Sequence, residues 1–190
     1  MTIILGSSSH YRKAVLTSMG ISFSVISPDI DERAIRRDDS RQLVEAIAQA
    51  KMDAVLRRVE GEAIVITSDM VIVVAGVVRE KPRTKEEAYA FLATLSTSPQ
   101  IATSCTVVCN TATGKRLSAV DEVIVTFDPI PEENIQTFVE SGEVFRYAGA
   151  LAAEHPLFKP FMHFEGEWES LMGLPKEKTK KMIEALTYVP

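Results

Sequence analysis

The most informative stretch of the sequence is IILGSSSHYRK, residues 3–13. Its short apolar run ends at Gly6, three serines follow, and the cation pair Arg12 and Lys13 opens a helical pattern. A strand, turn and helix start in this order bring backbone N–H groups, hydroxyls and the positive end of the helix dipole together. The stretch predicts a cradle for an anion, and an ordinary Ser-rich helix cap is the alternative that stays open.

Composition restricts the class of protein. The chain has 190 residues, of which 46% are hydrophobic and 25% charged, values typical of a globular protein. This length allows one domain or two small lobes, and we expect a single domain over residues 1–190. The formal net charge of −5 argues against nucleic acid or a membrane surface as a partner. Without a visible secretion signal or an apolar run of spanning length, the expected location is the cytoplasm.

The two cysteines, Cys105 and Cys109, lie in the strand-like sequence SCTVVC. Their even spacing places both on one face of a strand. No histidine or further cysteine stands around them at a zinc-binding spacing. We therefore expect two small buried hydrophobic residues in a reducing compartment.

Hydrophobic periodicity predicts an α/β fold, with an elongated mixed sheet and flanking helices. The run at residues 63–67 is continuously apolar, as in a strand buried on both faces, and it ends at Ser68 and Asp69. The expected strands cover residues 3–5, 23–26, 63–67, 71–74, 77–78, 102–109, 117–127 and 161–164. The expected helices begin near residues 14, 39, 84, 131 and 175 and end near residues 19, 58, 95, 140 and 186.

Charged side chains gather where these elements end, which is where ligands bind in α/β sheets. Two carboxylates, Glu32 and Asp69, are suited to Mg²⁺, which takes oxygen ligands and shares them with phosphates. Three cations are suited to neutralising a phosphoryl group and a leaving pyrophosphate, namely Arg12, Lys51 and Lys81. Two of these residues have a plainer alternative. Glu32 also fits a solvated turn, and Lys51 also fits an exposed helix face.

Several functional classes lack their motifs in this sequence. There is no G-x-x-x-x-G-K-[ST], H-E-x-x-H or G-x-S-x-G, which argues against a P-loop enzyme, a zinc protease and an α/β hydrolase. Tyr147 and Trp168 have rings that could stack on a base, but core packing is the better expectation for each.

An ordered set of motifs resembles the Maf family of house-cleaning nucleoside triphosphate pyrophosphatases. The motifs are IILGSSSHYRKAVL at 3–16, DIDE at 29–32, QAK at 49–51, TSDMV at 67–71, EKPRTKEEA at 80–88 and GEWESLMGLP at 166–175. The resemblance implies a fold related to inosine triphosphatases, with two lobes around a cleft. It also implies hydrolysis between the α- and β-phosphates, a divalent metal (Mg²⁺ or Mn²⁺) and a homodimer.

Matched position by position, the resemblance assigns roles to individual residues. The family's catalytic acid falls on Asp69, with Glu32 as a second metal ligand. Lys51 and Lys81 complete the expected catalytic set. Expected substrate contacts are Ser7, Ser9, Tyr11, Arg12, Lys13, Met70 and Glu154.

Three of these positions depart from the common family pattern, namely Tyr11, Met70 and Glu154. Together they resemble the subgroup that prefers 7-methyl-GTP over dTTP and UTP. A carboxylate at Glu154 can accept two parallel hydrogen bonds from a guanine edge, and a cationic 7-methylguanine favours an anion and a tyrosine face. The alternative is that Glu154 pairs with a neighbouring cation in its loop.

Three other functions stay open on the sequence. One is a dTTP/UTP pyrophosphatase of the same family. Another is a nucleotide-binding regulator of cell division without turnover, since the family name comes from septum formation in bacteria. The third is a phosphatase that removes only the terminal phosphate.

Overall fold

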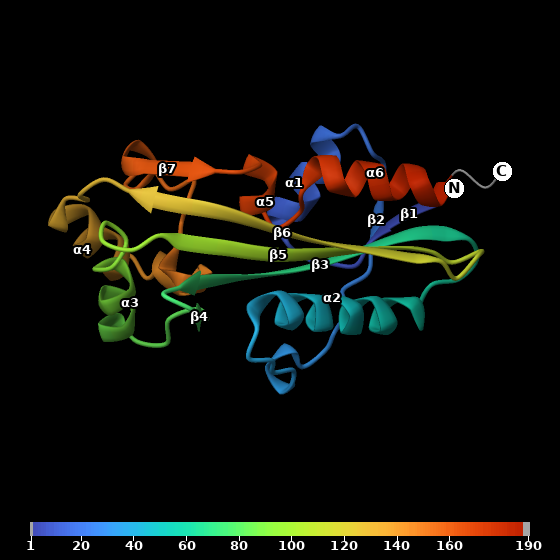
Figure 1. Ribbon diagram of the computed structural model, residues 1–190, viewed down its shortest axis with the longest axis horizontal. Coiled ribbons are helices and arrows are strands. Elements are labelled where there is room, and N and C mark those ends of the chain that lie inside the picture. The colour runs from blue at the N-terminus through green and yellow to red at the C-terminus, as the bar shows by residue number, and fades with distance from the viewer. Residues whose placement is uncertain (1, 188–190) are drawn as a thin grey trace. The chain divides into compact units, whose positions relative to one another are not determined.

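The computed structural model describes residues 2–187 and divides into two compact units (Figure 1). Unit 1 consists of Met1–Met70, Ser104–Asp121 and Glu167–Pro190, and unit 2 of Val71–Thr103 and Glu122–Gly166. Two units agree in number with the two lobes that the resemblance implies. The single domain over residues 1–190 stays a prediction, and residues 1 and 188–190 lie outside the described residues.

Strands of the described residues form a mixed sheet in the order β2-β1-β3-β5-β6-β7, with β4 paired to β3. The β1–β2 and β1–β3 pairs are parallel, whereas the β3–β4 and β6–β7 pairs are antiparallel. The mixed α/β fold class expected from the sequence is thus confirmed. The strand bounds are β1 Thr2–Leu5, β2 Ser24–Val25, β3 Ala63–Val74, β4 Val77–Arg79, β5 Gln100–Asn110, β6 Arg116–Phe127 and β7 Met162–Glu165.

Helices flank the sheet in each unit. In unit 1, α2 (Ser40–Leu56) lies on one face of the strands, and α1 (His10–Ser18) and α6 (Lys176–Thr187) lie on the other (Figure 1). The remaining helices are α3 Lys85–Leu92, α4 Glu132–Glu140 and α5 Trp168–Leu171, with 3-10 turns η1 Glu32–Ala34, η2 Glu143–Arg146, η3 Ala148–Ala150 and η4 Lys159–Phe161. No helix among residues 2–187 has the length and apolarity needed to cross a membrane.

The core of unit 1 holds the end of β1 in place. Leu5 and Ile66, partners on β1 and β3, pack in one apolar cluster with Leu16 of α1 and Met182 of α6. All four side chains are buried. Their close packing fixes the position of Leu5, the last residue of β1, and therefore of the turn that follows it.

Gly6 ends β1 in a space that only glycine fits. A Cβ at this position would lie 2.6 Å from Cγ2 of Thr67 and 2.9 Å from Cγ2 of Val55. The Gly6 N–H donates to the Ile66 carbonyl at 2.7 Å, which extends the parallel pairing by one residue. The chain therefore leaves β1 pressed against β3 and α2, and the serines begin at a fixed point.

Unit 2 has an aromatic core of its own. The Phe138 ring lies 4.9 Å from Phe158, 4.7 Å from His155 and 5.9 Å from Tyr147, measured between ring centroids. This contact agrees with the packing expectation for Tyr147. Outside the core, the Arg79 guanidinium lies 4.8 Å above the Phe91 ring.

The structure corrects one element boundary that matters for the site. The sequence predicts a strand ending at Thr67 and a separate strand from residue 71, but β3 runs without a break from Ala63 to Val74. Polar side chains within it find partners on neighbouring elements, as when Thr67 Oγ1 donates to the Ala48 carbonyl of α2 at 2.9 Å. Asp69 therefore lies inside a strand, and the argument that places it after a strand end is wrong in that detail.

Smaller differences concern short elements. The strand expected over residues 23–26 has only two paired residues, Ser24 and Val25. The four-residue helix α5, Trp168–Leu171, was not expected, because a single helical turn shows no clear periodicity. Both cysteines are free and buried, as expected.

Candidate active site

The serine turn after β1 is organised by Ser7 and Ser9. Ser7 is 5% exposed, and its hydroxyl accepts from the Ser9 N–H and from Arg12 Nη1, each at 3.2 Å. Ser9 is the N-cap of α1, because its side chain accepts from the Arg12 N–H at 3.4 Å. The helix-cap interpretation is thus confirmed. The backbone N–H groups of the first turn of α1 and the positive end of its dipole lie at this same N-terminus.

Lys51 is a buried cation held between two carboxylates. It follows Ile47 and precedes Val55 on the buried stripe of α2, so helical spacing turns its side chain inward. Its Nζ lies 2.7 Å from Asp69 Oδ1 and 2.9 Å from Glu32 Oε1. The side chains of Lys51 and Asp69 are 6% and 8% exposed, whereas that of Glu32 is 51% exposed. The surface interpretation of Lys51 is therefore wrong, because a buried ammonium needs such partners.

Burial and charge compete at this cluster, which we call the Lys51 cluster (Arg12, Glu32, Lys51 and Asp69). Burial raises the pKa of the Asp69 carboxyl, and the charges of Lys51 and Arg12 oppose that rise. Burial also lowers the pKa of the Arg12 guanidinium, against the attraction of Asp69 and Glu32. Two cations and two carboxylates balance, so the cluster is neutral when all four are charged.

The backbone carbonyl of Gly173 joins a third segment of unit 1 to this arrangement. It accepts from Arg12 Nε at 3.1 Å and from Ser68 Oγ at 2.6 Å. Ser68 and Asp69 are consecutive in β3, so their side chains leave opposite faces of the sheet. Asp69 meets α2 on one face, while Ser68 meets the α5–α6 connection on the other.

The chain matches the model of a known protein family. The family model described as Maf-like protein matches residues 2–186. The chain belongs to the Maf-like family. The family expected from the sequence motifs is thus confirmed over nearly the whole chain.

Named relatives of this Maf-like chain are nucleotide pyrophosphatases. A protein named 7-methyl-GTP pyrophosphatase from Dictyostelium discoideum is 39% identical over 97% of this chain and 97% of its own length. A dTTP/UTP pyrophosphatase from Symbiobacterium thermophilum is 36% identical over 98% of this chain and 94% of its own. A solved dITP/XTP pyrophosphatase from Mycobacterium abscessus is similar over 69% of this chain and 76% of its own, at 13% identity and a TM-score of 0.41.

The structure brings together most of the expected site residues of unit 1. Ser7, Ser9 and Arg12 share hydrogen bonds, and Lys51 joins Glu32 to Asp69. Three further expected contacts stand beside these residues in the chain and are partly buried, namely Tyr11 and Lys13 in the first turn of α1 and Met70 in β3. Their roles toward a substrate stay predictions.

Two expected residues, Lys81 and Glu154, belong to unit 2. Lys81 follows β4 and is exposed, and Glu154 is exposed in the segment after η3. Their roles in phosphate binding and base recognition likewise stay predictions.

The donor set of the Lys51 cluster fits a magnesium-type ion. Among residues 2–187 no group of three or more His, Cys, Asp and Glu side chains is placed to hold a metal. Mg²⁺ commonly binds through one or two carboxylates together with water and substrate phosphates. Glu32 and Asp69 supply two such carboxylates, and each uses one oxygen on Lys51 Nζ, which leaves the second oxygen of each for an ion.

Sequence reasoning missed Ser68 and Gly173. Both lie in motifs that carry the family resemblance, TSDMV and GEWESLMGLP, but the motifs by themselves predict no role for either residue. A Gly-Leu-Pro turn ahead of a helix signals a backbone bend and does not reveal which side chains its carbonyl accepts from. Only the fold shows that Arg12 and Ser68 meet there.

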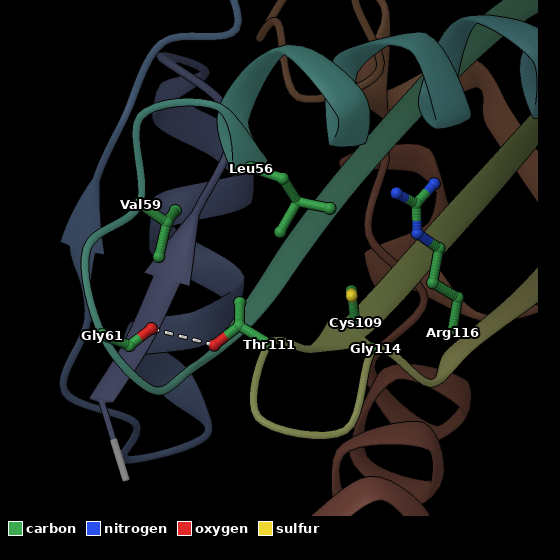
Figure 2. A pocket seen from close by; sticks show the side chains of 7 residues that line it. All are labelled: Leu56, Val59, Gly61, Cys109, Thr111, Gly114 and Arg116. Atoms are coloured by element: carbon green, nitrogen blue, oxygen red, sulfur yellow. Dashed lines mark hydrogen bonds between the residues drawn. The ribbon is translucent and has the colours of Figure 1, made fainter.

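An open pocket of about 350 Å³ lies elsewhere in unit 1 (Figure 2). It is lined by Leu56, Val59, Gly61, Cys109, Thr111, Gly114 and Arg116, none of which belongs to the Lys51 cluster. The Arg116 guanidinium is paired with Asp53 at 2.7 Å, and Thr111 Oγ1 donates to the Gly61 carbonyl at 3.1 Å. This pocket offers one cation, against two cations and the serine turn at the Lys51 cluster, so it is the weaker candidate for phosphate binding.

Proposed function

We propose that this Maf-like protein hydrolyses a nucleoside triphosphate between the α- and β-phosphates, giving a nucleoside monophosphate and pyrophosphate. The observation that carries the proposal is the Lys51 cluster. A buried lysine, two carboxylates and an arginine stand with the serine turn in one compact unit. The names of the relatives support the same reaction.

In the proposed reaction, Asp69 acts as the general base. It accepts a proton from the water that attacks the α-phosphorus, and the bond from that phosphorus to the bridging oxygen breaks. The raised pKa of Asp69 suits this role, because it makes the carboxylate a better proton acceptor near neutral pH.

Cations stabilise the charge that develops on the leaving pyrophosphate. Arg12 and Lys51 of unit 1 would donate to phosphate oxygens, with Lys81 of unit 2 as a third cation. The serine turn would hold the phosphates through the Ser7 and Ser9 hydroxyls and backbone N–H groups. Positioning and electrostatics thus account for most of the proposed catalysis.

A divalent metal is part of the proposal, with Glu32 and Asp69 as its protein ligands. When bound, Mg²⁺ or Mn²⁺ would neutralise phosphate oxygens and lower the pKa of a coordinated water. The partly exposed Glu32 supports this assignment, because metal and substrate reach it without unfolding the core.

We propose 7-methyl-GTP as the preferred substrate. The Dictyostelium relative carries that name and matches nearly the whole chain. Glu154 supports the proposal chemically, since its carboxylate would accept from the N1–H and the exocyclic amine of a guanine while its charge favours the cationic 7-methyl base. Hydrolysis of dTTP or UTP is the second candidate, favoured by the relative from Symbiobacterium.

We also propose a cellular location, the absence of a nucleic-acid partner and an oligomeric state for this protein. Free, buried cysteines support a cytoplasmic location, and the acidic net charge supports action without nucleic acid. A homodimer is proposed on the family resemblance alone, and light scattering coupled to gel filtration tests it.

The deciding experiment measures pyrophosphate release with Mg²⁺ from 7-methyl-GTP, GTP, UTP, dTTP and inosine triphosphate. We expect strong preference for 7-methyl-GTP and no release of inorganic phosphate. Preference for UTP or dTTP would keep the enzyme and overturn the substrate. Nucleotide binding without release from any of the five would instead favour the non-catalytic regulator, and release of phosphate alone would favour a phosphatase.

A further inference from the structure

The Gly173 carbonyl is a meeting point of three chain segments in unit 1. Arg12 of α1 donates to it through Nε at 3.1 Å, and Ser68 of β3 donates through Oγ at 2.6 Å. The donors lie 161 and 105 residues from Gly173 along the sequence, so only the fold brings them together. A carbonyl has two lone pairs, and this one uses both on side chains.

The position of this carbonyl is fixed from both sides. The Gly173 N–H donates to the Ser170 carbonyl at 2.9 Å, which closes α5, and the next helix, α6, begins at Lys176. Gly173 has φ +78, a conformation that glycine adopts without strain. A Cβ here would lie 3.1 Å from Arg12 Nε and 3.2 Å from Nη2, so the absent side chain also makes room for the guanidinium.

Ser68 restrains the carbonyl from inside the sheet. Its side chain is fully buried, and its Oγ also accepts a long hydrogen bond of 3.5 Å from Thr106 Oγ1 on β5. With this contact oriented by β5, the Ser68 hydroxyl proton points to Gly173 and not elsewhere. Such a buried chain of hydroxyls is rigid because no water competes for it.

Arg12 is consequently held through two of its N–H groups before any ligand arrives. Nε is bound by Gly173 and Nη1 by Ser7 Oγ, and these two contacts set both the plane and the rotation of the guanidinium. Of the five N–H donors of an arginine, the remaining three can address phosphate oxygens. A guanidinium group whose orientation is already fixed loses less side-chain entropy when it binds a phosphate.

We propose that Ser68, acting through the Gly173 carbonyl, is a positioning residue that aims Arg12 at the pyrophosphate portion of the substrate. The proposal rests on the proposed function. Ser68 does not touch the substrate. Its removal frees the Gly173 carbonyl to shift and lets the Arg12 fork rotate.

The test is a double-mutant cycle that measures the dissociation constant of inorganic pyrophosphate by calorimetry, with Mg²⁺ present. Ser68→Ala removes the hydroxyl, and Arg12→Lys keeps the charge but removes the Nε donor and the fork. We expect Ser68→Ala to weaken pyrophosphate binding about tenfold in the wild-type background. In the Arg12→Lys background the same change should have no further effect, because there is no fork left to aim.

A matched control separates positioning from general loss of stability. Thr111→Val removes a hydroxyl that also donates to a glycine carbonyl, that of Gly61, at a more exposed position outside the Lys51 cluster. It should leave pyrophosphate binding unchanged, whatever its effect on the melting temperature. Equal weakening by both variants, or a Ser68→Ala effect that persists in Arg12→Lys, would overturn the proposal.

A spectroscopic readout keeps this proposal separate from the proposed function. In the ligand-free protein the Nε–H resonance of Arg12, assigned by its absence in Arg12→Lys, should shift and exchange faster in Ser68→Ala. An unchanged resonance would overturn the positioning role even if the enzyme is active. Failure of every nucleotide to yield pyrophosphate would overturn the proposed function, while the resonance and the binding cycle would still decide the role of Ser68.

Discussion

Unit 1 and unit 2 each contain a lysine–carboxylate pair of nearly the same length in very different surroundings. The Lys51–Asp69 pair of unit 1 measures 2.7 Å with side chains 6% and 8% exposed. The Lys85–Glu140 pair of unit 2 measures 2.6 Å with side chains 47% and 52% exposed. Water and salt screen the exposed pair strongly and the buried pair much less. Distance alone therefore does not identify a functional ion pair, whereas burial together with further charged neighbours does.

The largest expected difference between the two pairs is in turnover. Asp69→Asn keeps the shape of the side chain but removes the proposed base and its charge. We expect the rate of pyrophosphate release to fall on the order of 100- to 10,000-fold. The matched variant Glu140→Gln should retain wild-type turnover. Near-full activity of Asp69→Asn in the same assay would refute the assignment of the base.

The second contrast is in stability. Lys51→Met leaves Asp69 buried without its partner at 2.7 Å, and breaking such a buried pair costs about 3 kcal/mol of unfolding free energy. Lys85→Met, which opens the exposed pair, should leave the urea midpoint unchanged within error. Urea unfolding of both variants tests the contrast. Equal midpoints would mean that burial does not separate the two pairs.

A third prediction asks whether an exposed charge of unit 2 matters for substrate choice. Glu154→Gln replaces the exposed carboxylate by an amide of similar shape. We expect kcat/KM for 7-methyl-GTP to fall about tenfold while kcat/KM for UTP does not fall. Competition between the two nucleotides measures this ratio directly, and Glu143→Gln, a change at another carboxylate of unit 2, is its control. An unchanged ratio would count against base recognition by Glu154.

The smallest expected effect is a pH dependence of stability. Burial raises the pKa of Asp69 in the folded protein, so protonation of this group favours folding. That contribution is complete below the unfolded aspartate value of about 3.9 and is lost as the pH rises through the raised folded pKa. The unfolding free energy of the wild type, relative to Asp69→Asn, should therefore decline as the pH increases from about 4. A difference that stays constant or grows with pH would contradict the raised pKa.

Much of the fold was predictable from local pattern. The apolar run that ends at Gly6 and the serines after it predict a strand, a turn and a helix start, which the structure has as β1, the serine turn and α1. The continuity of β3 was not predictable, because Ser68 and Asp69 look like the end of a strand until their partners are known. Those partners are Lys51 of α2, 18 residues away, and the Gly173 carbonyl, 105 residues away.

The sequence predicts which residues belong to the candidate site better than it predicts the contacts between them. The motifs single out Arg12, Lys51 and Asp69, but the helical pattern of α2 also fits an exposed lysine. The Arg12 contact to a backbone carbonyl carries no sequence signal, since every residue has a carbonyl. For this reason Ser68 and Gly173 came only from the structure.

The unit boundaries have a consequence for how this protein can change. They fall at residues 70/71, 103/104 and 121/122, inside β3, β5 and β6, and again at 166/167. Each unit is assembled from separate stretches of the gene, and three of the four crossings cut a continuous strand. Neither unit can be inherited, deleted or exchanged as one uninterrupted cassette. An exchange at one of these three boundaries would build a strand from two parents, whose halves would have to agree in register and in the face they bury.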